Sequence, residues 1–270
     1  MSTGIRQGAL AQALVVNSGY QVLTKWARYK AVIRVCLFGI DVLLSFVWLR
    51  LFLRSRVAPL ALLALLVLVW LPLSAPALQF EPSKIRQTAV SRFGARAGNA
   101  VDRWIANLDS ARGLSERRQL DVVNDFWNTN AMAGEDTHIW GQLDYWATPI
   151  ETLGKMAADC EDFVIGKYFS LLHLGVPNEK LRLIYVRAQV GGQSIAHMVL
   201  GYYPTLQSEP LLLDNLSGSI RPASQRPDLT PVFSFNSQGV YVGNAQKGSV
   251  DSISRWRGLL EKMRKEGFVP

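Results

Sequence analysis

The order of periodicities along the chain limits its fold more than any other sequence feature. Between residues 84 and 173, apolar residues recur every three to four positions, which is typical of amphipathic helices. Residues 181–242 instead hold short runs of strand-forming residues, separated by turns that contain Gly, Gln, Ser or Pro. A last helix is predicted from about 251 to 265. Helices followed by strands predict an α+β domain in which N-terminal helices precede an antiparallel β-sheet.

Local signals divide the helical part into four segments. The first covers 84–111 and is expected to break near Gly98, and the second runs from Ser115 to Trp127. Thr148-Pro149-Ile150-Glu151 supplies a cap, a Pro in the first turn and a Glu three residues after the cap, which predicts a third helix start. The fourth helix is predicted from Asp159 to His173. The predicted strands are 181–190, 196–203, 211–216, 231–235 and 240–242.

The first 77 residues differ in charge from the rest of the chain. They hold 8 Lys and Arg but one acid, Asp41, which leaves 21 basic and 20 acidic side chains in residues 78–270. Of the net charge of +8, +7 therefore belongs to the first segment and +1 to the rest, and we expect no nucleic-acid partner. We interpret residues 1–77 as a hydrophobic leader and residues 78–270 as one domain.

The leader has the features of an export signal. Residues 57–73 are uncharged and apolar, Arg54-Ser55-Arg56 precedes them, and Ala75-Pro76-Ala77 follows. A charged start, an apolar run and a small-x-small end predict a cleaved secretory signal, with cleavage after Ala77. An uncleaved membrane anchor is the alternative, since 17 apolar residues nearly span a bilayer. Residues 1–50 are either an over-long start or a second membrane-associated segment.

Cys160 is a candidate nucleophile because of its position. The only other cysteine, Cys36, lies in the leader, so cleavage would leave Cys160 without a disulfide partner. Cys160 follows Asp159 at a predicted helix start, where the helix dipole favours a thiolate and free N–H groups can bind an oxyanion. The alternative is an ordinary small buried residue.

Two later strands supply candidate partners for this thiol. His197 lies in an apolar strand, 37 residues after Cys160, and Asp214 lies in the next apolar run, 17 residues further on. A buried carboxylate needs a partner, and antiparallel pairing can place Asp214 beside His197. Asp214 would then orient the imidazole, as in nucleophile–His–acid triads. A helical Cys followed by His and Asp on strands is the order of a papain/transglutaminase-like core.

Several motifs stand in order around these residues. They are Asp144-Tyr145-Trp146-Ala147-Thr148-Pro149, Asp159-Cys160-Glu161-Asp162-Phe163, Lys167-Tyr168, Leu174-Gly175-Val176-Pro177, Ala196-His197-Met198-Val199-Leu200 and Leu213-Asp214-Asn215-Leu216. From about residue 105 to 242 the chain resembles the bacterial transglutaminase-like cysteine proteinases, the LapG-type periplasmic adhesin proteases. The resemblance implies a periplasmic endopeptidase that cleaves a large surface adhesin near its N-terminus and so controls biofilm attachment. It also implies an inhibitor, an inner-membrane cyclic-di-GMP receptor of the LapD type with a periplasmic domain.

Three acids surround the candidate nucleophile. Asp159, Glu161 and Asp162 should raise the pKa of the thiol, and helix capping accounts for one or two of them. A bound Ca²⁺ would cancel the repulsion, and a distant Arg folded over the cluster is the alternative. The resemblance implies calcium dependence, which we carry over to Asp159 and Glu161 as ligands. Asp162 and Asp144 are further candidates.

The sequence leaves two other functions open. One is transglutaminase-type acyl transfer, because a triad does not distinguish water from an amine as the acceptor. The other is a non-catalytic transglutaminase-like binding module, although such a module should have lost one of the three residues. Labelling with iodoacetamide separates a reactive Cys160 from an inert one.

Overall fold

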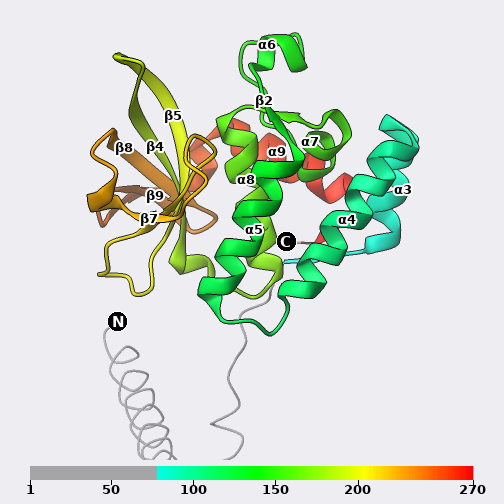
Figure 1. Ribbon diagram of the computed structural model, residues 1–270, viewed down its shortest axis with the longest axis horizontal. Helices are drawn as coiled ribbons and strands as arrows, with labels where there is room; N and C mark the ends of the chain where they lie inside the picture. Colours follow the sequence, from blue (N-terminus) through cyan, green and yellow to red (C-terminus); the bar gives the residue numbers. More distant parts are fainter. Residues whose placement is uncertain (1–77, 270) are drawn as a thin grey trace, which may run out of the picture. The chain divides into compact units, whose positions relative to one another are not determined.

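The computed structural model describes residues 78–269. The predicted leader, residues 1–77, lies outside them, so its cleavage, its membrane association and the domain boundary stay predictions. Within 78–269, no helix combines the length and the apolarity needed to cross a membrane. In the folded residues 78–269, most of the helices lie on one side and the main β-sheet on the other, with helix α8 between them (Figure 1). The predicted α+β class, with a transglutaminase-like core, is confirmed.

The predicted helices are present in the predicted order, α5 runs on to Asn130 beyond the predicted Trp127, and the short helix α6 is additional. The chain breaks at Gly94, which adopts a φ of 84°, and not at the predicted Gly98. Gly98 instead lies inside a helix, where a Cβ would come within 2.5 Å of the Val90 side chain, so its role is close packing between two helices. The bounds are α3 Pro82–Phe93, α4 Ala95–Ala111, α5 Glu116–Asn130, α6 Asp136–Ile139, α7 Pro149–Lys155, α8 Cys160–His173 and α9 Ser254–Glu266.

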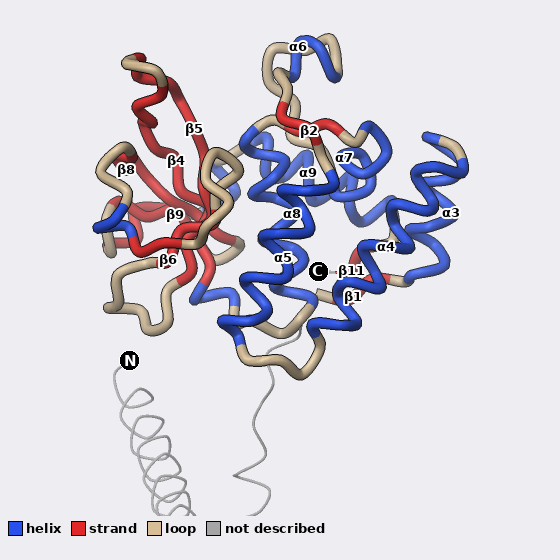
Figure 2. The backbone as a smooth tube through the Cα atoms, in the orientation of Figure 1, coloured by secondary structure: helices blue, strands red, loops and turns tan. Residues whose placement is uncertain are grey.

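The main sheet is antiparallel and has seven strands in the order β10-β9-β8-β4-β5-β6-β7 (Figure 2). Its strands are β4 Leu181–Val190, β5 Gln193–Tyr202, β6 Leu211–Leu213, β7 Arg221–Pro222, β8 Leu229–Asn236, β9 Gly239–Val242 and β10 Ala245–Gly248. Two small sheets pair β1 (Gln79–Phe80) with β11 (Phe268–Val269), and β2 (Met132–Ala133) with β3 (Ala157–Ala158). β6 ends before the predicted residue 216, because the Asp214 carboxylate accepts a hydrogen bond from the Leu216 amide at 3.0 Å and turns the chain out of the ladder.

Helix α8 is the element around which the core is built. It packs against β4 and β5 on one side and against α5 and α7 on the other. The indole N–H groups of Trp104 (α4) and Trp127 (α5) both donate to the Ser170 hydroxyl, at 2.9 and 3.0 Å. At Gly166, a Cβ would lie 2.6 Å from the Trp127 ring, so only glycine allows this approach. These contacts fix the position of α8, and with it the position of its first residue, Cys160.

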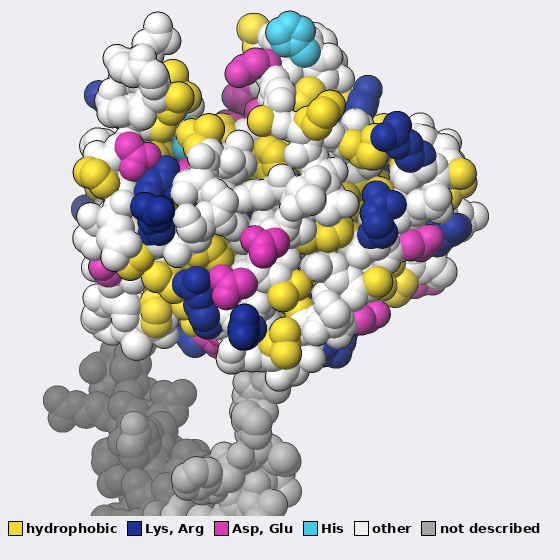
Figure 3. Space-filling view, in the orientation of Figure 1, with side chains coloured by type: hydrophobic (Ala, Val, Ile, Leu, Met, Phe, Trp, Pro, Cys, Tyr) yellow, Lys and Arg dark blue, Asp and Glu magenta, His cyan; other side chains and the backbone are white. Residues whose placement is uncertain are grey.

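The sheet is apolar on both faces. The larger core fills the space between the helices and one face, and helix α9 joins it through Trp256, which stacks on Phe169 of α8 with ring centroids 5.7 Å apart. A smaller cluster covers the other face, and its members are Ile184, Val186, Ala188, Val199, Leu212 and Leu229. This two-sided burial agrees with the apolar runs in the buried parts of β4 and β5, where apolar and polar residues do not alternate regularly. On the side shown in Figure 3, basic and acidic side chains are interspersed over the surface.

Candidate active site

Cys160 is the first residue of α8, as predicted. Its neighbour Asp159 caps the helix by accepting a hydrogen bond from the Asp162 amide at 3.1 Å. The Cys160 thiol is a free cysteine and partly buried. The structure therefore places this thiol at the N-terminal end of a rigid, buried helix.

His197 and Asp214 form the pair that the sequence predicts. His197 Nε2 lies 2.8 Å from Asp214 Oδ1, and the two side chains are 3% and 0% exposed. Because Nε2 bonds the carboxylate, Nδ1 is the ring nitrogen left for proton exchange with another group. β5 carries His197, and the turn after β6 carries Asp214.

The carboxylate of Asp214 is held in its ionised form. Burial alone would raise its pKa, but hydrogen bonds from His197, the Leu216 amide and Arg226 outweigh burial and lower the pKa of Asp214 to about 2. Arg226 donates from Nη2 to Asp214 Oδ2 at 2.8 Å. Sequence reasoning missed Arg226, since nothing in the local pattern connects it with a strand twelve residues earlier. An ionised, oriented carboxylate is what a His partner in a triad requires.

The thiol lies in an acidic environment. Cys160 Sγ donates to Glu161 Oε2 at 2.8 Å, and among residues 78–269 no hydrogen bond joins the thiol to His197. Burial raises the pKa of the Cys160 thiol above its usual value, and Glu161 and Asp159 raise it further, whereas the amide of Met198 acts in the opposite direction. Burial and the flanking acids therefore act together against thiolate formation, which for the acids is the expected direction.

Three carboxylates converge beside the start of α8. Asp136, Asp159 and Asp162 each contribute an oxygen, and these oxygens lie within 4.8 Å of one another. Of the predicted ligands, the structure brings Asp159 and Asp162 into this group. Glu161 accepts a hydrogen bond from the Cys160 thiol, and its role as a ligand stays a prediction. Asp144, the other candidate ligand, forms an ion pair with Arg255 at 2.7 Å.

Asp136 is the member that sequence reasoning did not find. It opens the short helix α6, 23 residues before Asp159, so spacing gives no hint that the two meet. The connection is made by the β2–β3 pairing, in which Ala133 lies opposite Ala158 and brings the two segments together. The only local indication was the polar Gly134-Glu135-Asp136 sequence.

The oxygens of this group suit a hard cation. Asp136 Oδ1 and Asp162 Oδ2 are buried and have no hydrogen-bond partner within residues 78–269. Burial, followed by the charges of Asp162, Glu161 and Asp136, raises the pKa of Asp159 to about 10. A divalent cation that prefers carboxylate oxygens, such as Ca²⁺, fits this donor set.

No Arg or Lys takes the place of such a cation. Among the ion pairs of residues 78–269, none includes Asp136, Asp159 or Asp162. The nearby ammonium of Lys262 bonds Glu151 at 2.8 Å instead. Within residues 78–269, no Arg or Lys side chain therefore neutralises these carboxylates by an ion pair, which was the alternative to a bound cation.

Comparison with known proteins agrees with the geometry. The family model described as "bacterial transglutaminase-like cysteine proteinase" matches residues 102–228. The solved structure of Legionella pneumophila LapG is 38% identical, with a TM-score of 0.60, and the match covers 69% of this chain and 99% of LapG. The structure of EGTA-treated LapG is also 38% identical, with a TM-score of 0.61, and the match covers 69% of this chain and 100% of LapG. The calcium-bound LapG structure is 38% identical, with a TM-score of 0.59, and the match covers 68% of this chain and 99% of LapG. No curated protein matches the chain.

Fold and similarity together define a transglutaminase-like cysteine protease. The chain belongs to the bacterial transglutaminase-like cysteine proteinase family and is similar to LapG over nearly the whole length of that protein.

Proposed function

We propose that Cys160, His197 and Asp214 are the catalytic triad of an endopeptidase. Cys160 gives its proton to His197 and attacks the peptide carbonyl, and the amine then leaves with that proton. Water, activated by the same imidazole, hydrolyses the thioester and regenerates the thiol. The observation that carries this proposal is the buried His197–Asp214 pair, 2.8 Å apart. β5, which carries His197, packs against the helix that begins with Cys160.

We further propose that the protease is calcium-dependent. Asp136, Asp159 and Asp162 would hold the ion, with Glu161 as the fourth acid of the site. A bound Ca²⁺ would supply positive charge beside the thiol. The residues themselves explain why this matters, since the acids that flank Cys160 raise the pKa of its thiol. Similar LapG structures exist in calcium-bound and EGTA-treated forms, which supports the proposal for this chain.

The proposed substrate is a large cell-surface adhesin, cleaved near its N-terminus in the periplasm, with biofilm attachment as the process under control. The proposed inhibitor is an inner-membrane cyclic-di-GMP receptor with a periplasmic domain. The similarity to LapG over 99% of the length of that protein supports this assignment. If the leader is not cleaved, the protease would work while tethered to the inner membrane.

Cleavage assays test the reaction and the ion together. The purified protein is incubated with recombinant N-terminal fragments of large surface adhesins, in Ca²⁺, in EGTA, and in EGTA followed by excess Ca²⁺ or Mg²⁺. We expect cleavage in Ca²⁺, loss in EGTA, and recovery with Ca²⁺ better than with Mg²⁺, because Mg²⁺ holds its waters and demands a tighter octahedron. Cleavage that EGTA leaves unchanged contradicts the calcium proposal.

A labelled amine added to the same reactions tests acyl transfer. Hydrolysed fragments without incorporated amine support the endopeptidase. Amine incorporation without chain cleavage contradicts it and supports the transferase alternative.

A further inference from the structure

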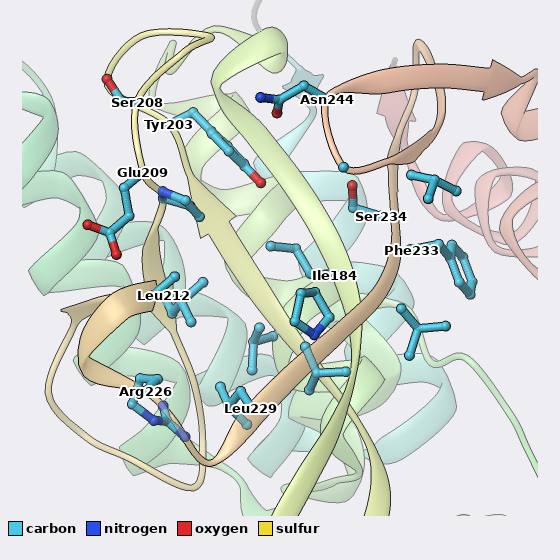
Figure 4. Close-up of a pocket in the computed structure, with 18 of the residues that line it drawn as sticks. Ile184, Tyr203, Ser208, Glu209, Leu212, Arg226, Leu229, Phe233, Ser234 and Asn244 are labelled. Carbon is cyan, nitrogen blue, oxygen red and sulfur yellow. The ribbon is translucent and has the colours of Figure 1, made fainter.

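Arg226 is a cation in an unusually buried position. Only 7% of the residue is exposed, and it lies between the short 3-10 helix Ala223–Gln225 and strand β8. Two backbone hydrogen bonds close the turn around it, from its amide to the Ala223 carbonyl at 2.9 Å and from the Leu229 amide to its carbonyl at 3.1 Å. Arg226 and Leu229 lie at one end of a cavity of about 500 Å³ (Figure 4). A buried charge is stable only when it is paired, so its partners define its role.

The partners of Arg226 are two carboxylates. Nη2 donates to Asp214 Oδ2 at 2.8 Å and to Asp228 Oδ2 at 2.7 Å, and Nε donates to Asp228 Oδ1 at 3.0 Å. The Asp228 side chain is 39% exposed, whereas that of Asp214 is fully buried. Arg226 thus connects an outer carboxylate to the carboxylate that faces His197.

Both oxygens of the Asp214 carboxylate accept hydrogen bonds. Oδ1 accepts from His197 Nε2 at 2.8 Å and from the Leu216 amide at 3.0 Å, and Oδ2 accepts from Arg226. A rotation of the carboxylate about its Cβ–Cγ bond would break at least one of these hydrogen bonds. Within residues 78–269, Arg226 is the hydrogen-bond donor to Oδ2, so without it this fully buried oxygen would be left without a hydrogen bond.

We propose that Arg226 is a positioning residue of the protease, which acts through Asp214. It fixes the plane of the carboxylate so that Oδ1 stays on His197 Nε2, and the imidazole keeps Nδ1 free to take the thiol proton. This inference rests on the proposed triad. A guanidinium suits the role because its planar fork can hold two carboxylates at once, which a single ammonium does less well.

A double-mutant cycle tests this proposal. The variants are Arg226→Met, Asp214→Asn and the double variant, with the exposed Arg221→Met on β7 as the matched control, and kcat and KM are measured on a cleaved adhesin fragment in Ca²⁺. We expect Arg226→Met to lower kcat by about 10- to 100-fold at nearly constant KM, because a small misplacement of the imidazole costs rate and not substrate binding. The double variant should be about as active as Asp214→Asn alone, since Arg226 has no route to the chemistry once Asp214 is changed.

Two results would overturn the inference. One is an Arg226→Met enzyme with the activity of the Arg221→Met control, and the other is a double variant whose losses multiply. An Asp214→Asn enzyme of normal activity is a different outcome, because it removes the triad and the proposed function with it. If Arg226→Met has normal activity while Asp214→Asn is impaired, the positioning role of Arg226 is excluded and the proposed triad still stands.

Further variants keep the test decisive if Arg226→Met does not fold, which a melting curve shows directly. Arg226→Lys keeps the charge but loses the fork, and we expect its kcat to fall about 10-fold. Asp228→Asn leaves the Arg226–Asp214 contact in place and removes its outer anchor, so a loss of only a few-fold is expected. Full activity in a folded Arg226→Lys enzyme contradicts the requirement for a guanidinium.

Discussion

His197 Nε2 and Asp214 Oδ1 lie 2.8 Å apart in a site that excludes water from both side chains. The pair joins β5 to the turn that ends β6, and the Leu216 amide also donates to Asp214 Oδ1, at 3.0 Å. Leu213, the last residue of β6, lies opposite Leu200 of β5. Asp214 therefore follows directly after the paired residues, at the end of the strand next to the one that carries His197.

The charge of Asp214 should matter for the reaction. Asp214→Asn keeps the size of the side chain but removes the carboxylate that orients the imidazole and stabilises its protonated form. We expect kcat/KM to fall by about 10³- to 10⁴-fold. Steady-state cleavage kinetics measure this, with the exposed Asp109→Asn as control, and a rate near that of the wild type would exclude Asp214 from the triad.

The three-carboxylate group and Glu161 make different predictions for calcium. Asp136→Asn should weaken the rise in melting temperature on adding Ca²⁺, although Asp136 lies far from Cys160 in sequence, because its carboxylate belongs to the group. In the wild type, Ca²⁺ at a hundredfold excess over Kd should add about 2.7 kcal/mol to the free energy of unfolding. Melting curves with EGTA and with Ca²⁺ test this, with the exposed Asp109→Asn as control.

Glu161→Gln, measured in the same experiment, distinguishes a calcium site of three carboxylates from one that also includes Glu161. If Glu161 is a ligand, Glu161→Gln weakens the calcium shift as Asp136→Asn does. A full calcium shift in Glu161→Gln beside a lost one in Asp136→Asn would limit the site to the three carboxylates. A full shift in Asp136→Asn would contradict the role of that group.

Lys167 is a buried cation that should lower stability. It lies inside α8, its Nζ has no hydrogen-bond partner within residues 78–269, and burial, opposed by Asp214 and Asp125, lowers the pKa of Lys167 to about 7. Below pH 7 the Lys167 side chain is protonated in both the folded and the unfolded chain, and the loss of folding stability caused by burying its charge is complete. This loss becomes smaller as the pH rises toward 10.5, the pKa of the side chain in the unfolded chain. Lys167→Met should therefore raise the free energy of unfolding, most at pH 6 and least at pH 10.

Urea denaturation across this pH range checks the Lys167 prediction, with the exposed Lys247→Met as control. A Lys167→Met variant that is less stable than the wild type at pH 6 would mean that the ammonium has a stabilising partner. A gain that grows with pH would reverse the sign of the argument.

Ser170 holds two tryptophans at once. Ser170→Ala removes the acceptor of the Trp104 and Trp127 indole N–H groups and leaves both donors unsatisfied in the core. At about 1–3 kcal/mol for each buried unsatisfied group, we expect the free energy of unfolding to fall by about 2–4 kcal/mol. Urea denaturation measures this against the exposed Ser110→Ala, and an equal stability of the two variants would contradict the role of Ser170.

The elements that the sequence predicted well are those with local causes. The capping box at the start of α7 is present, with Thr148 Oγ1 accepting from the Glu151 amide at 3.2 Å and Glu151 Oε2 accepting from the Thr148 amide at 3.0 Å. Strand β4 has its predicted bounds, and helix α8 begins one residue after the predicted start because Asp159 is its N-cap. The cap, the Gly175 that follows the helix and the apolar run of β4 can all be read from neighbouring residues.

The features that escaped prediction depend on contacts between distant segments. The break at Gly94 required knowing that Gly98 is needed for packing against Val90. Asp136 joins the carboxylate group only through the pairing of β2 with β3, and Arg226 reaches Asp214 only through the turn before β8. Charged residues in loops carry no periodicity, so their partners appear only once the fold is formed.

Cys160 is the proposed nucleophile of this protease, and every other assignment in the site depends on it. The direct measurement compares adhesin-fragment cleavage in Ca²⁺ by the wild type and by Cys160→Ala, with melting curves to show that both are folded. We expect no detectable cleavage by Cys160→Ala at an unchanged melting temperature, because a small-for-small change at a helix start removes the thiol and little else. Cleavage by a folded Cys160→Ala protein would show that Cys160 is not the nucleophile.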